Sequence, residues 1–419
     1  MTTLEELGLL KMDFLGLRTL TVIRDALDLI EKNHGRKIDF SKMDYDDPKV
    51  FELLSSGNTL GVFQMESAGM RSFMKQLKPS NFEDIVAGIS LYRPGPMDSI
   101  PTYLEYKHNP EKITYIHEKL KPIMEVTYGC LIYQEQVMEV VRELGGYSYG
   151  RSDLVRRAMG KKKMDVMEEE RQYFIHGKTD ENGNVEIAGC VRNGVDEQTA
   201  NKIFDDMIDF AKYAFNKSHA AAYANISYKT AWLKCHYPRE YMAALLSSVL
   251  DNQNKLASYI TECKRLGIRV LPPNVNESNL HFTVSGNDIR YGLLAVKNLG
   301  RNFIDEIISE RINNPYEDFF DFCKRLYGRN MNSRAIESLI KCGAFDGLGA
   351  NRRQLLAISK TVLDDVEYES RRNAGGQMSF FDDAEVDVQS SKPQIPDLPE
   401  FPVSELLHCL LYTSPSPRD

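Results

Sequence analysis

The sequence lacks any uninterrupted apolar stretch of the roughly 18 residues that a membrane-spanning helix requires. Its seven cysteines are scattered singly and form no Cys-x-x-Cys pair, which argues against a disulfide framework and a thiolate zinc site. The first residues also lack the basic start and apolar core of a secretory signal peptide. These absences argue against a membrane-spanning or a secreted, disulfide-rich protein. We expect the protein to be located in a reducing cytoplasm.

A uniformly basic nucleic-acid-binding surface is also missing, since the net charge is −8 at pH 7. The charge is unevenly distributed, however. Residues 151–163 contain six basic side chains and one acidic side chain, Asp153, whereas residues 364–387 are rich in acids. The length of 419 residues exceeds one ordinary hydrophobic core and predicts about two to four domains.

The spacing of apolar residues predicts a mainly α-helical protein with minor β structure, in the α+β class. Glycine, proline and capping residues then suggest where elements begin and end. The expected elements are a strand over 8–16, a helix capped by Thr19, a short helix from Pro48 to Gly57, mainly helical structure over 60–270 that is interrupted at 93–96, a short β run within 180–194, and short helices over 290–357.

One aspartate, Asp13, interrupts the apolar segment "LLKMDFLGLRTL". An ionised carboxylate in an apolar strand is costly unless it is paired, hydrogen-bonded or bound to a metal. Asp13 therefore either ends the strand and pairs with Arg18, or binds a metal ion. A Mg²⁺ site for phosphoryl transfer needs further carboxylates, usually in an Asp-x-Asp. Asp44 and Asp46 have that spacing, but their position before Pro48 favours helix capping.

Three segments carry groups suited to phosphate. "RSDLVRRAMGKKK" (151–163) offers arginines for bidentate contacts and lysines as point charges, unless it is only a solvated basic face. "FNKSHAAAY" (215–223) turns helical after Ser218, the expected N-cap of a helix whose N-terminus attracts phosphate. Arg93 lies on a loop stiffened by two prolines, which suits preorganised phosphate binding; a buried arginine tying loops together is the alternative.

Two later segments have the pattern of helix, glycine turn, helix. "LLAVKNLGRNFIDEII" (293–308) turns at Gly300, with Asn298 where helix-hairpin-helix units usually have glycine. "LIKCGAFDGLGANRRQLL" (339–356) has three glycines before Arg352 and Arg353. In such a unit, N–H groups at the helix start bind a DNA phosphate without reading sequence.

A polar tail follows the second of these segments. "GGQMSFFDD" (375–383) places Met378, Phe380 and Phe381 in a stretch that is otherwise polar. Exposed apolar residues in such a tail often form a docking peptide for a partner protein. A hydrophobic turn without function is the alternative.

Taken together, these strings resemble the bacterial DNA polymerase III alpha subunit, the family C replicative polymerases. The resemblance covers roughly residues 4–400. It is carried by "LGLLKMDFLGLRTLTVI", "GNTLGVFQMES", "LYRPGPMDSIPTY", "TYGCLIYQEQVM", "LVRRAMGKKK", "FNKSHAAAYA", "YPREYMAALLSSVLDN" and a clamp-binding-like "QMSFF".

The resemblance implies Mg²⁺-dependent, template-directed addition of deoxynucleotides to a primer 3′-hydroxyl, with release of pyrophosphate. In that family a polymerase beta-like palm carries three aspartates that bind two Mg²⁺ ions. Asp13 corresponds to the third, and the Asp-x-Asp of the other two matches nothing in this chain, so we expect the chain alone to be inactive. The implied divisions are a palm remnant over 1–50, fingers over 51–270, a tandem helix-hairpin-helix region over 271–372, a linker with a sliding-clamp peptide over 373–407, and a non-native tail over 408–419, where the sequence departs from the family.

The resemblance and the residue types together assign four sets of site residues. The catalytic and metal-binding residue is Asp13. Nucleotide or primer–template contacts are expected from Arg93, Arg156, Arg157, Lys161, Lys162, Lys163, Asn216, Lys217, Ser218 and His219. Duplex DNA is expected to contact Lys297, Gly300, Arg301, Gly349, Arg352 and Arg353. Clamp binding is expected from Gln377, Met378, Ser379, Phe380 and Phe381.

The implied partners are primer–template DNA, deoxynucleoside triphosphates, the sliding clamp and other replicase subunits. Two other functions remain open at this point. One is a non-catalytic module that binds DNA and the clamp. The other is a metal-dependent phosphodiesterase that uses Asp13 with Asp44 and Asp46.

Overall fold

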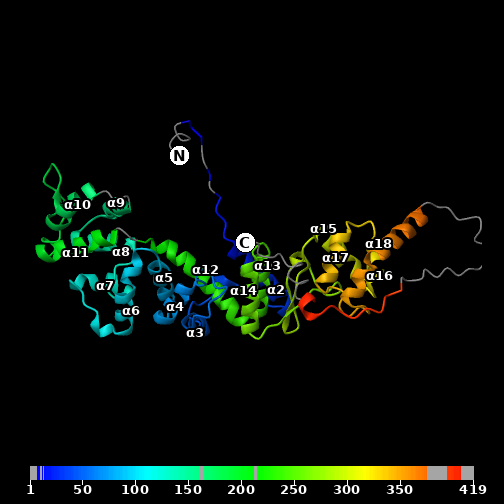
Figure 1. The fold of residues 1–419 in the computed structure, drawn as a ribbon. Helices are drawn as coiled ribbons and strands as arrows, with labels where there is room; N and C mark the ends of the chain where they lie inside the picture. The colour runs from blue at the N-terminus through cyan, green and yellow to red at the C-terminus, as the bar shows by residue number, and fades with distance from the viewer. Residues whose placement is uncertain are drawn as a thin grey trace, which may run out of the picture. The chain divides into compact units, whose positions relative to one another are not determined.

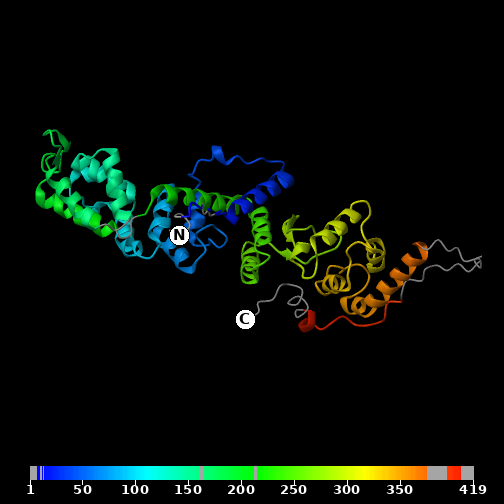
Figure 2. The same cartoon turned by 90° about the horizontal axis from the view of Figure 1, so that it is seen from above.

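The computed structural model is mainly helical and has two small sheets, as the α+β prediction requires (Figures 1 and 2). It describes residues 7–9, 12, 14–160, 164–211, 215–374 and 394–406. Contacts divide the chain into a central unit, Asp39–Cys235, and a flanking unit, Met1–Ile38 with His236–Asp419. The five-part division predicted from the sequence stays a prediction. None of the helices in the described residues is long and apolar enough to cross a membrane.

The central unit is built almost entirely of helices, and α3, α4 and α5 begin at polar caps. Asp47 caps α3 by accepting from the Lys49 N–H, and Gly57 ends that helix at φ 66°, as the Pro48–Gly57 prediction anticipated. The elements are η1 (Phe40–Lys42), α3 (Pro48–Ser56), α4 (Ala68–Leu77), α5 (Phe82–Leu91), η2 (Pro96–Ser99), α6 (Ile100–His108), η3 (Pro110–Lys112), η4 (Glu118–Leu120), α7 (Lys121–Met124), η5 (Glu125–Thr127), α8 (Gln134–Gly145), α9 (Tyr149–Gly160), α10 (Met164–His176), β1 (Lys178–Thr179), β2 (Val185–Ile187), α11 (Glu197–Ala211) and α12 (Lys217–His236), whose last residue belongs to the flanking unit.

Two hydrophobic clusters form the core of the central unit. The first joins α3, α4 and α5 to α12, with the buried Tyr228 among the rings of its neighbours. The second joins α8, α9, α10 and α11, with Phe174 and Phe204 in contact at its centre. Strands β1 and β2 pair in an antiparallel hairpin. β2 lies within the region 180–194, where a short β run was predicted, and β1 lies just before that region.

The flanking unit combines a helical pair, a small sheet and a helical subdomain. The strands of this sheet lie in the order β3-β5-β4, with β3 parallel and β4 antiparallel to β5. Phe303, Phe322 and Phe345 lie at the centre of the subdomain core. The elements are α2 (Arg18–His34), which packs on α13 (Pro238–Ser248), then α14 (Gln253–Arg265), β3 (Val270–Leu271), β4 (Thr283–Ser285), β5 (Asp288–Arg290), η6 (Leu293–Ala295), α15 (Arg301–Arg311), α16 (Phe319–Leu326), α17 (Ser333–Lys341) and α18 (Arg352–Ala374).

The predicted strand over 8–16 is not found where the structure describes this segment. Phe14 and Leu15 are in no strand and are 90% and 95% exposed. A strand needs a neighbour to satisfy its N–H and C=O groups, and none of the described strands pairs with this segment. The prediction that Thr19 caps the next helix is also wrong. The helix begins at Arg18, after Leu17, which makes no side-chain cap.

Candidate functional site

The Arg93 loop and the start of α12 meet in the central unit although they are far apart in sequence. The guanidinium carbon of Arg93 lies 4.0 Å from the centre of the Phe215 ring. Phe215 is fixed in turn by its carbonyl, which accepts from the Gln134 N–H at 2.9 Å. Arg93 is exposed, which excludes the buried loop-tying arginine. Because the Phe215 ring packs against the guanidinium of this exposed residue, Arg93 is placed to bind an anion.

The N-terminal end of α12 is capped differently from the prediction. The side-chain oxygen of Asn216, not Ser218, accepts from the His219 N–H at 2.9 Å. The carboxylate of Glu135 accepts from the Lys217 N–H at 3.0 and 3.1 Å and from the Asn216 amide at 3.1 Å. Ser218 is already inside the helix and is exposed. An acidic group therefore already occupies this helix end, and a phosphate would have to contact the side chains beside it.

The predicted α12 residues consequently divide into two kinds. Lys217 is held by an ion pair with Glu83 at 3.1 Å and lies 5.2 Å above the Tyr133 ring, and Asn216 is held by Glu135. These two residues shape the site. Ser218 and His219 are exposed and stand on the same end of the helix as Phe215, the ring that holds Arg93.

A row of aromatic rings, which the sequence analysis missed, continues from Arg93 along α12. Ring centres are 5.6 Å apart for Phe215 and His219, 4.3 Å for His219 and Tyr223, and 5.2 Å for Tyr223 and Phe63. The spacing of 215, 219 and 223 is the helical i, i+4, i+8 pattern and was the available signal. Such a row beside a cation suits stacking of an unpaired nucleic-acid base.

The basic segment of α9 lies in the other core cluster of the central unit, among α8, α10 and α11. Arg156 and Arg157 both donate to Asp153, at 2.8 and 2.7 Å. The hydrogen bond from Arg156 is the main cause that lowers the pKa of Asp153 below its ordinary value. The Arg157 side chain remains largely exposed, so it is more accessible to a ligand than that of Arg156. The side chains of residues 161–163 lie outside the described residues.

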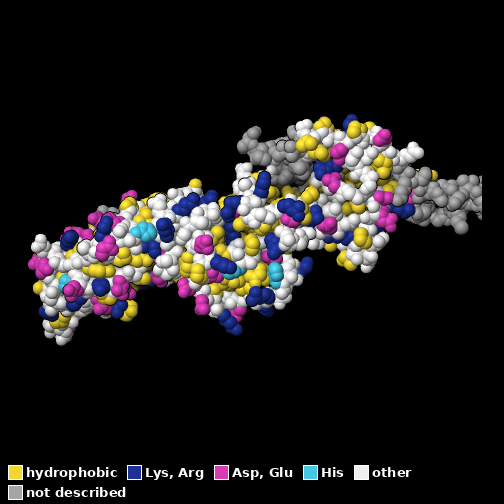
Figure 3. Space-filling model, turned by 90° about the horizontal axis from the view of Figure 1, so that it is seen from below, with side chains coloured by type: hydrophobic (Ala, Val, Ile, Leu, Met, Phe, Trp, Pro, Cys, Tyr) yellow, Lys and Arg dark blue, Asp and Glu magenta, His cyan; other side chains and the backbone are white. Residues whose placement is uncertain are grey.

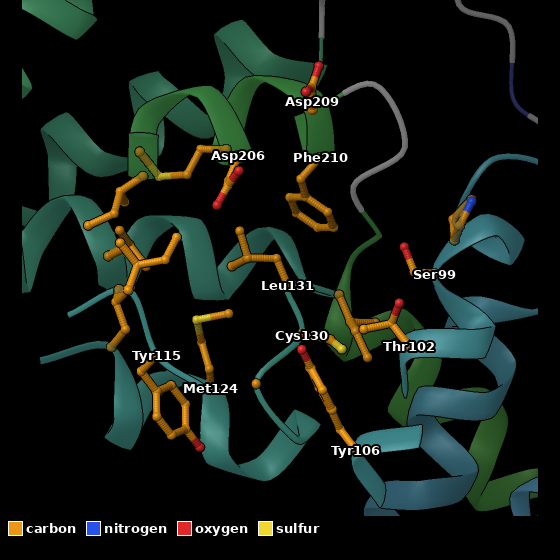
Figure 4. Close-up of a pocket in the computed structure, with 18 of the residues that line it drawn as sticks. Ser99, Thr102, Tyr106, Tyr115, Met124, Cys130, Leu131, Asp206, Asp209 and Phe210 are labelled. Atoms are coloured by element: carbon orange, nitrogen blue, oxygen red, sulfur yellow. The ribbon is translucent and has the colours of Figure 1, made fainter. Parts of the chain in front are cut away.

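A cavity of about 580 Å³ lies next to α11 and α6 (Figure 4). Its charged lining residues are all acidic: Asp98, Asp206 and Asp209. Figure 4 shows the Asp206 carboxylate turned toward the cavity and the Phe210 ring toward Leu131. Desolvation raises the pKa of Asp206. Apolar walls with acidic groups suit an apolar group that carries a cation, and they disfavour a triphosphate.

The first predicted hairpin of the flanking unit keeps its turn despite Asn298. This residue adopts φ 63°, the left-handed conformation that asparagine tolerates better than most residues, and its amide donates to the Ser338 hydroxyl at 2.9 Å. Gly300 is the N-cap residue of α15 and supplies no side-chain cap, and Arg301, the first residue of the helix, is exposed. Lys297 is half-buried. The expected helix before the turn is only a 3₁₀ turn, η6.

The second predicted hairpin is less open to a phosphate. Gly343, Gly347 and Gly349 have φ of 81°, 91° and 89°, which only glycine adopts readily. The Arg352 guanidinium donates to both carboxylate oxygens of Asp346 at 3.0 and 2.6 Å. The Arg352 side chain is therefore already paired with a carboxylate, and its contact with DNA stays a prediction.

A complete metal site is not present among the described residues. Asp13 lies outside them. Asp44 and Asp46 are exposed before α3, whose cap is the next carboxylate, Asp47. No group of three or more His, Cys, Asp or Glu side chains within the described ranges is arranged to hold a metal ion. The only residue assigned to the two-Mg²⁺ site lies outside the described residues, so that assignment stays a prediction, and the phosphodiesterase hypothesis gains no support.

Surface charge is mixed rather than continuous. On the face in Figure 3, Lys and Arg side chains are interspersed with Asp and Glu side chains. This pattern agrees with the net charge of −8 and shows no continuous basic surface on this face.

Comparison with known proteins relates both units to one family. Residues 19–182 match the bacterial DNA polymerase III alpha subunit finger domain, and residues 267–355 match the helix-hairpin-helix motif. DNA polymerase III subunit alpha of Bacillus subtilis is 44% identical over 407 residues, which are 97% of this chain and 35% of that protein. The Thermus aquaticus subunit is 46% identical over 391 residues, 92% of this chain and 31% of that protein. The Staphylococcus epidermidis subunit is 45% identical over 373 residues, 88% of this chain and 34% of that protein.

The chain thus spans about a third of the length of the curated relatives that it matches. The similarity nevertheless extends across the central unit and the helix-hairpin-helix region together. The chain belongs to the DNA polymerase III alpha subunit family.

Proposed function

We propose that this chain forms the fingers and duplex-binding part of a DNA-directed DNA polymerase, which adds deoxynucleotides to a primer 3′-hydroxyl. The observation that carries the proposal is the contact between Arg93 and Phe215. It joins the proline-stiffened loop to the start of α12, where Arg93, Ser218 and His219 are exposed beside half-buried aromatic rings.

Each group on this surface has a chemical role in the proposal. Arg93 binds a phosphate of the nucleotide or template through its fork of N–H donors. The rings of His219, Tyr223 and Phe63 provide faces on which a base can stack. Asn216 and Lys217 position α12 through Glu135 and Glu83. The residues of α9, Arg156 and Arg157 with Lys161–Lys163, supply further phosphate contacts.

Duplex DNA contacts the flanking unit in this proposal. The N–H groups at the start of α15 have no intrahelical acceptor, and Gly300 leaves room for a phosphate to approach them. Arg301 adds a charge next to them, and Lys297 adds another before the turn. Contacts of this kind hold DNA of any sequence.

Magnesium enters the proposal only as the cofactor of the whole polymerase. Two Mg²⁺ ions would supply charge neutralisation for the transferred phosphoryl group. Asp13 is the residue of this sequence assigned to hold them. The described residues do not complete such a site, so no catalytic step is assigned to a metal here.

The proposal predicts that the chain binds DNA but does not extend a primer. Fluorescence anisotropy with a labelled primer–template should show binding that weakens steeply with salt, because phosphate contacts release counterions. Incubation with Mg²⁺ and deoxynucleotides should leave the primer length unchanged on a gel. The intact gene product is the positive control, and its extension separates a polymerase from a non-catalytic DNA- and clamp-binding module. Lack of DNA binding would reject the proposal. Primer extension by the pure chain would show that this chain contains the further carboxylates that Asp13 needs to bind the metal ions.

A sliding clamp is the proposed partner of residues 377–381, which lie outside the described residues. We expect Gln377 to hydrogen-bond, Ser379 to act as a spacer, and Met378, Phe380 and Phe381 to fill apolar pockets. Alanine at Gln377, Phe380 and Phe381 together should abolish capture of this chain by an immobilised clamp. The matched control carries alanine at the polar residues Gln389, Ser390 and Ser391. Undiminished capture by the first variant would remove this role.

A further inference from the structure

The segment 396–401 lies across the N-terminal end of α18, within the flanking unit. The Gln354 side-chain amide donates to the Pro396 carbonyl at 2.9 Å, and the Asn351 amide donates to the Leu398 carbonyl at 2.8 Å. Arg353 lies 5.8 Å from the centre of the Phe401 ring. The segment is therefore held in one register on this helix end.

This register places the carboxylate of Glu400 on the first N–H groups of α18. One oxygen accepts from the Arg352 N–H at 3.1 Å, and the other accepts from the Arg353 N–H at 3.3 Å. The Phe401 N–H also donates to Glu400, at 2.8 Å. The 23 residues of α18 give this end a partial positive charge. Two carboxylate oxygens thus occupy the place that two phosphate oxygens take at a helix N-terminus.

Of the two arginine side chains at this helix end, Arg353 is the one that fits the same ligand, because it is exposed. Arg352 is fixed on Asp346, and this hydrogen bond is the main cause that raises the pKa of its guanidinium. Arg353 is exposed and contacts Phe401 of the covering segment. Departure of the segment would release both the N–H groups and Arg353. The start of α15 differs, since no side-chain cap is found there.

We propose that Glu400 is an internal competitor for DNA phosphate at the second hairpin. Duplex DNA then binds first to the open hairpin at Gly300 and Arg301. It gains the contact at α18 only when residues 396–401 leave. This inference rests on the proposed function, because it assumes that the flanking unit binds duplex DNA.

The test compares duplex-DNA affinity of the full chain with that of Glu400→Gln, which keeps the size of the side chain and removes its charge. Glu405→Gln is the matched control, because Glu405 is exposed just beyond this segment and its backbone N–H donates to the Pro402 carbonyl. We expect Glu400→Gln to bind a blunt duplex about two- to fivefold more tightly at low salt, as a charge at a helix terminus predicts. Combining Arg353→Ala with Glu400→Gln in one variant should cancel this gain in duplex affinity.

Each result has a distinct meaning. Equal tightening by Glu400→Gln and Glu405→Gln would show a general charge effect and overturn the inference. Binding by the wild-type chain with no change in Glu400→Gln would overturn the inference and leave the proposed function standing. Absence of duplex binding in every variant would overturn both. A gain in Glu400→Gln that Arg353→Ala does not cancel would also reject the α18 site. Matching thermal unfolding curves exclude misfolding as the cause.

Discussion

Replacing Lys107 with methionine should lower the free energy of unfolding of the central unit by about 3–5 kcal/mol. The Lys107 ammonium lies 2.7 Å from Asp84, and the two side chains are only 6% and 1% exposed. Asp84 also accepts from the Ser80 N–H at 2.8 Å and from the Tyr128 hydroxyl at 3.0 Å. These neutral donors do not replace a cation, so the variant leaves an uncompensated buried carboxylate.

The single tryptophan makes this measurement specific to the central unit. Trp232 lies on α12, partly buried against the first core cluster and 5.8 Å from Phe40 between ring centres. Urea unfolding followed by tryptophan fluorescence therefore reports on the unit that contains Lys107. The matched control is Lys112→Met. Lys112 pairs with Glu105 at 2.9 Å, but both side chains are about half exposed.

The control, Lys112→Met, should lower the free energy of unfolding by less than about 1 kcal/mol, because an exposed ion pair is screened by water and salt. The two variants remove the same charge from neighbouring positions, so a difference between them measures burial. Equal and small losses would mean that Asp84 is adequately satisfied by Ser80 and Tyr128. In that case the ion pair contributes nothing measurable to the fold.

Elements with local signals could be predicted from the sequence. Pro48 and Gly57 mark the start and end of α3 because both effects act within a few residues. The strand predicted around Asp13 failed at its described residues because pairing depends on a distant partner. Asn216 and Ser218 are both good caps by type. The side chain of Glu135, far away in sequence, fixes Asn216 in its place, and no local pattern contains that information.

The candidate site shows the same limit. Arg93 was identified because prolines on both sides of a glycine make a rigid loop, and "FNKSH" because polar groups precede a helix. Their meeting through Phe215 is a long-range contact that spacing does not encode. Glu400 is a third case of a contact between distant segments. It covers the start of α18 from the other side of the predicted clamp peptide, so the sequence alone left the second hairpin as open as the first.

Replacing Arg93 with alanine should weaken binding of a primer–template by about fivefold to tenfold, a loss of about 1 kcal/mol. The variant removes the exposed guanidinium and the cation above Phe215 while leaving the Glu135 cap of α12 in place. Arg93→Lys should recover less than half of the loss, because lysine keeps the charge but not the planar fork. Anisotropy at fixed low salt measures all variants.

Two further variants decide whether Arg93 acts through its position or only through its charge. Arg192→Ala removes the same charge from another exposed position of the central unit and should change affinity less than twofold. Phe215→Leu keeps Arg93 and most of the apolar volume but removes the ring beneath it, and about a twofold loss is expected from the missing cation–π contact. If Arg93→Ala and Arg192→Ala weaken binding equally, only net charge matters. If Phe215→Leu also has no effect, the surface at the start of α12 does not bind DNA through Arg93, because the contact that positions this arginine would then be irrelevant to affinity.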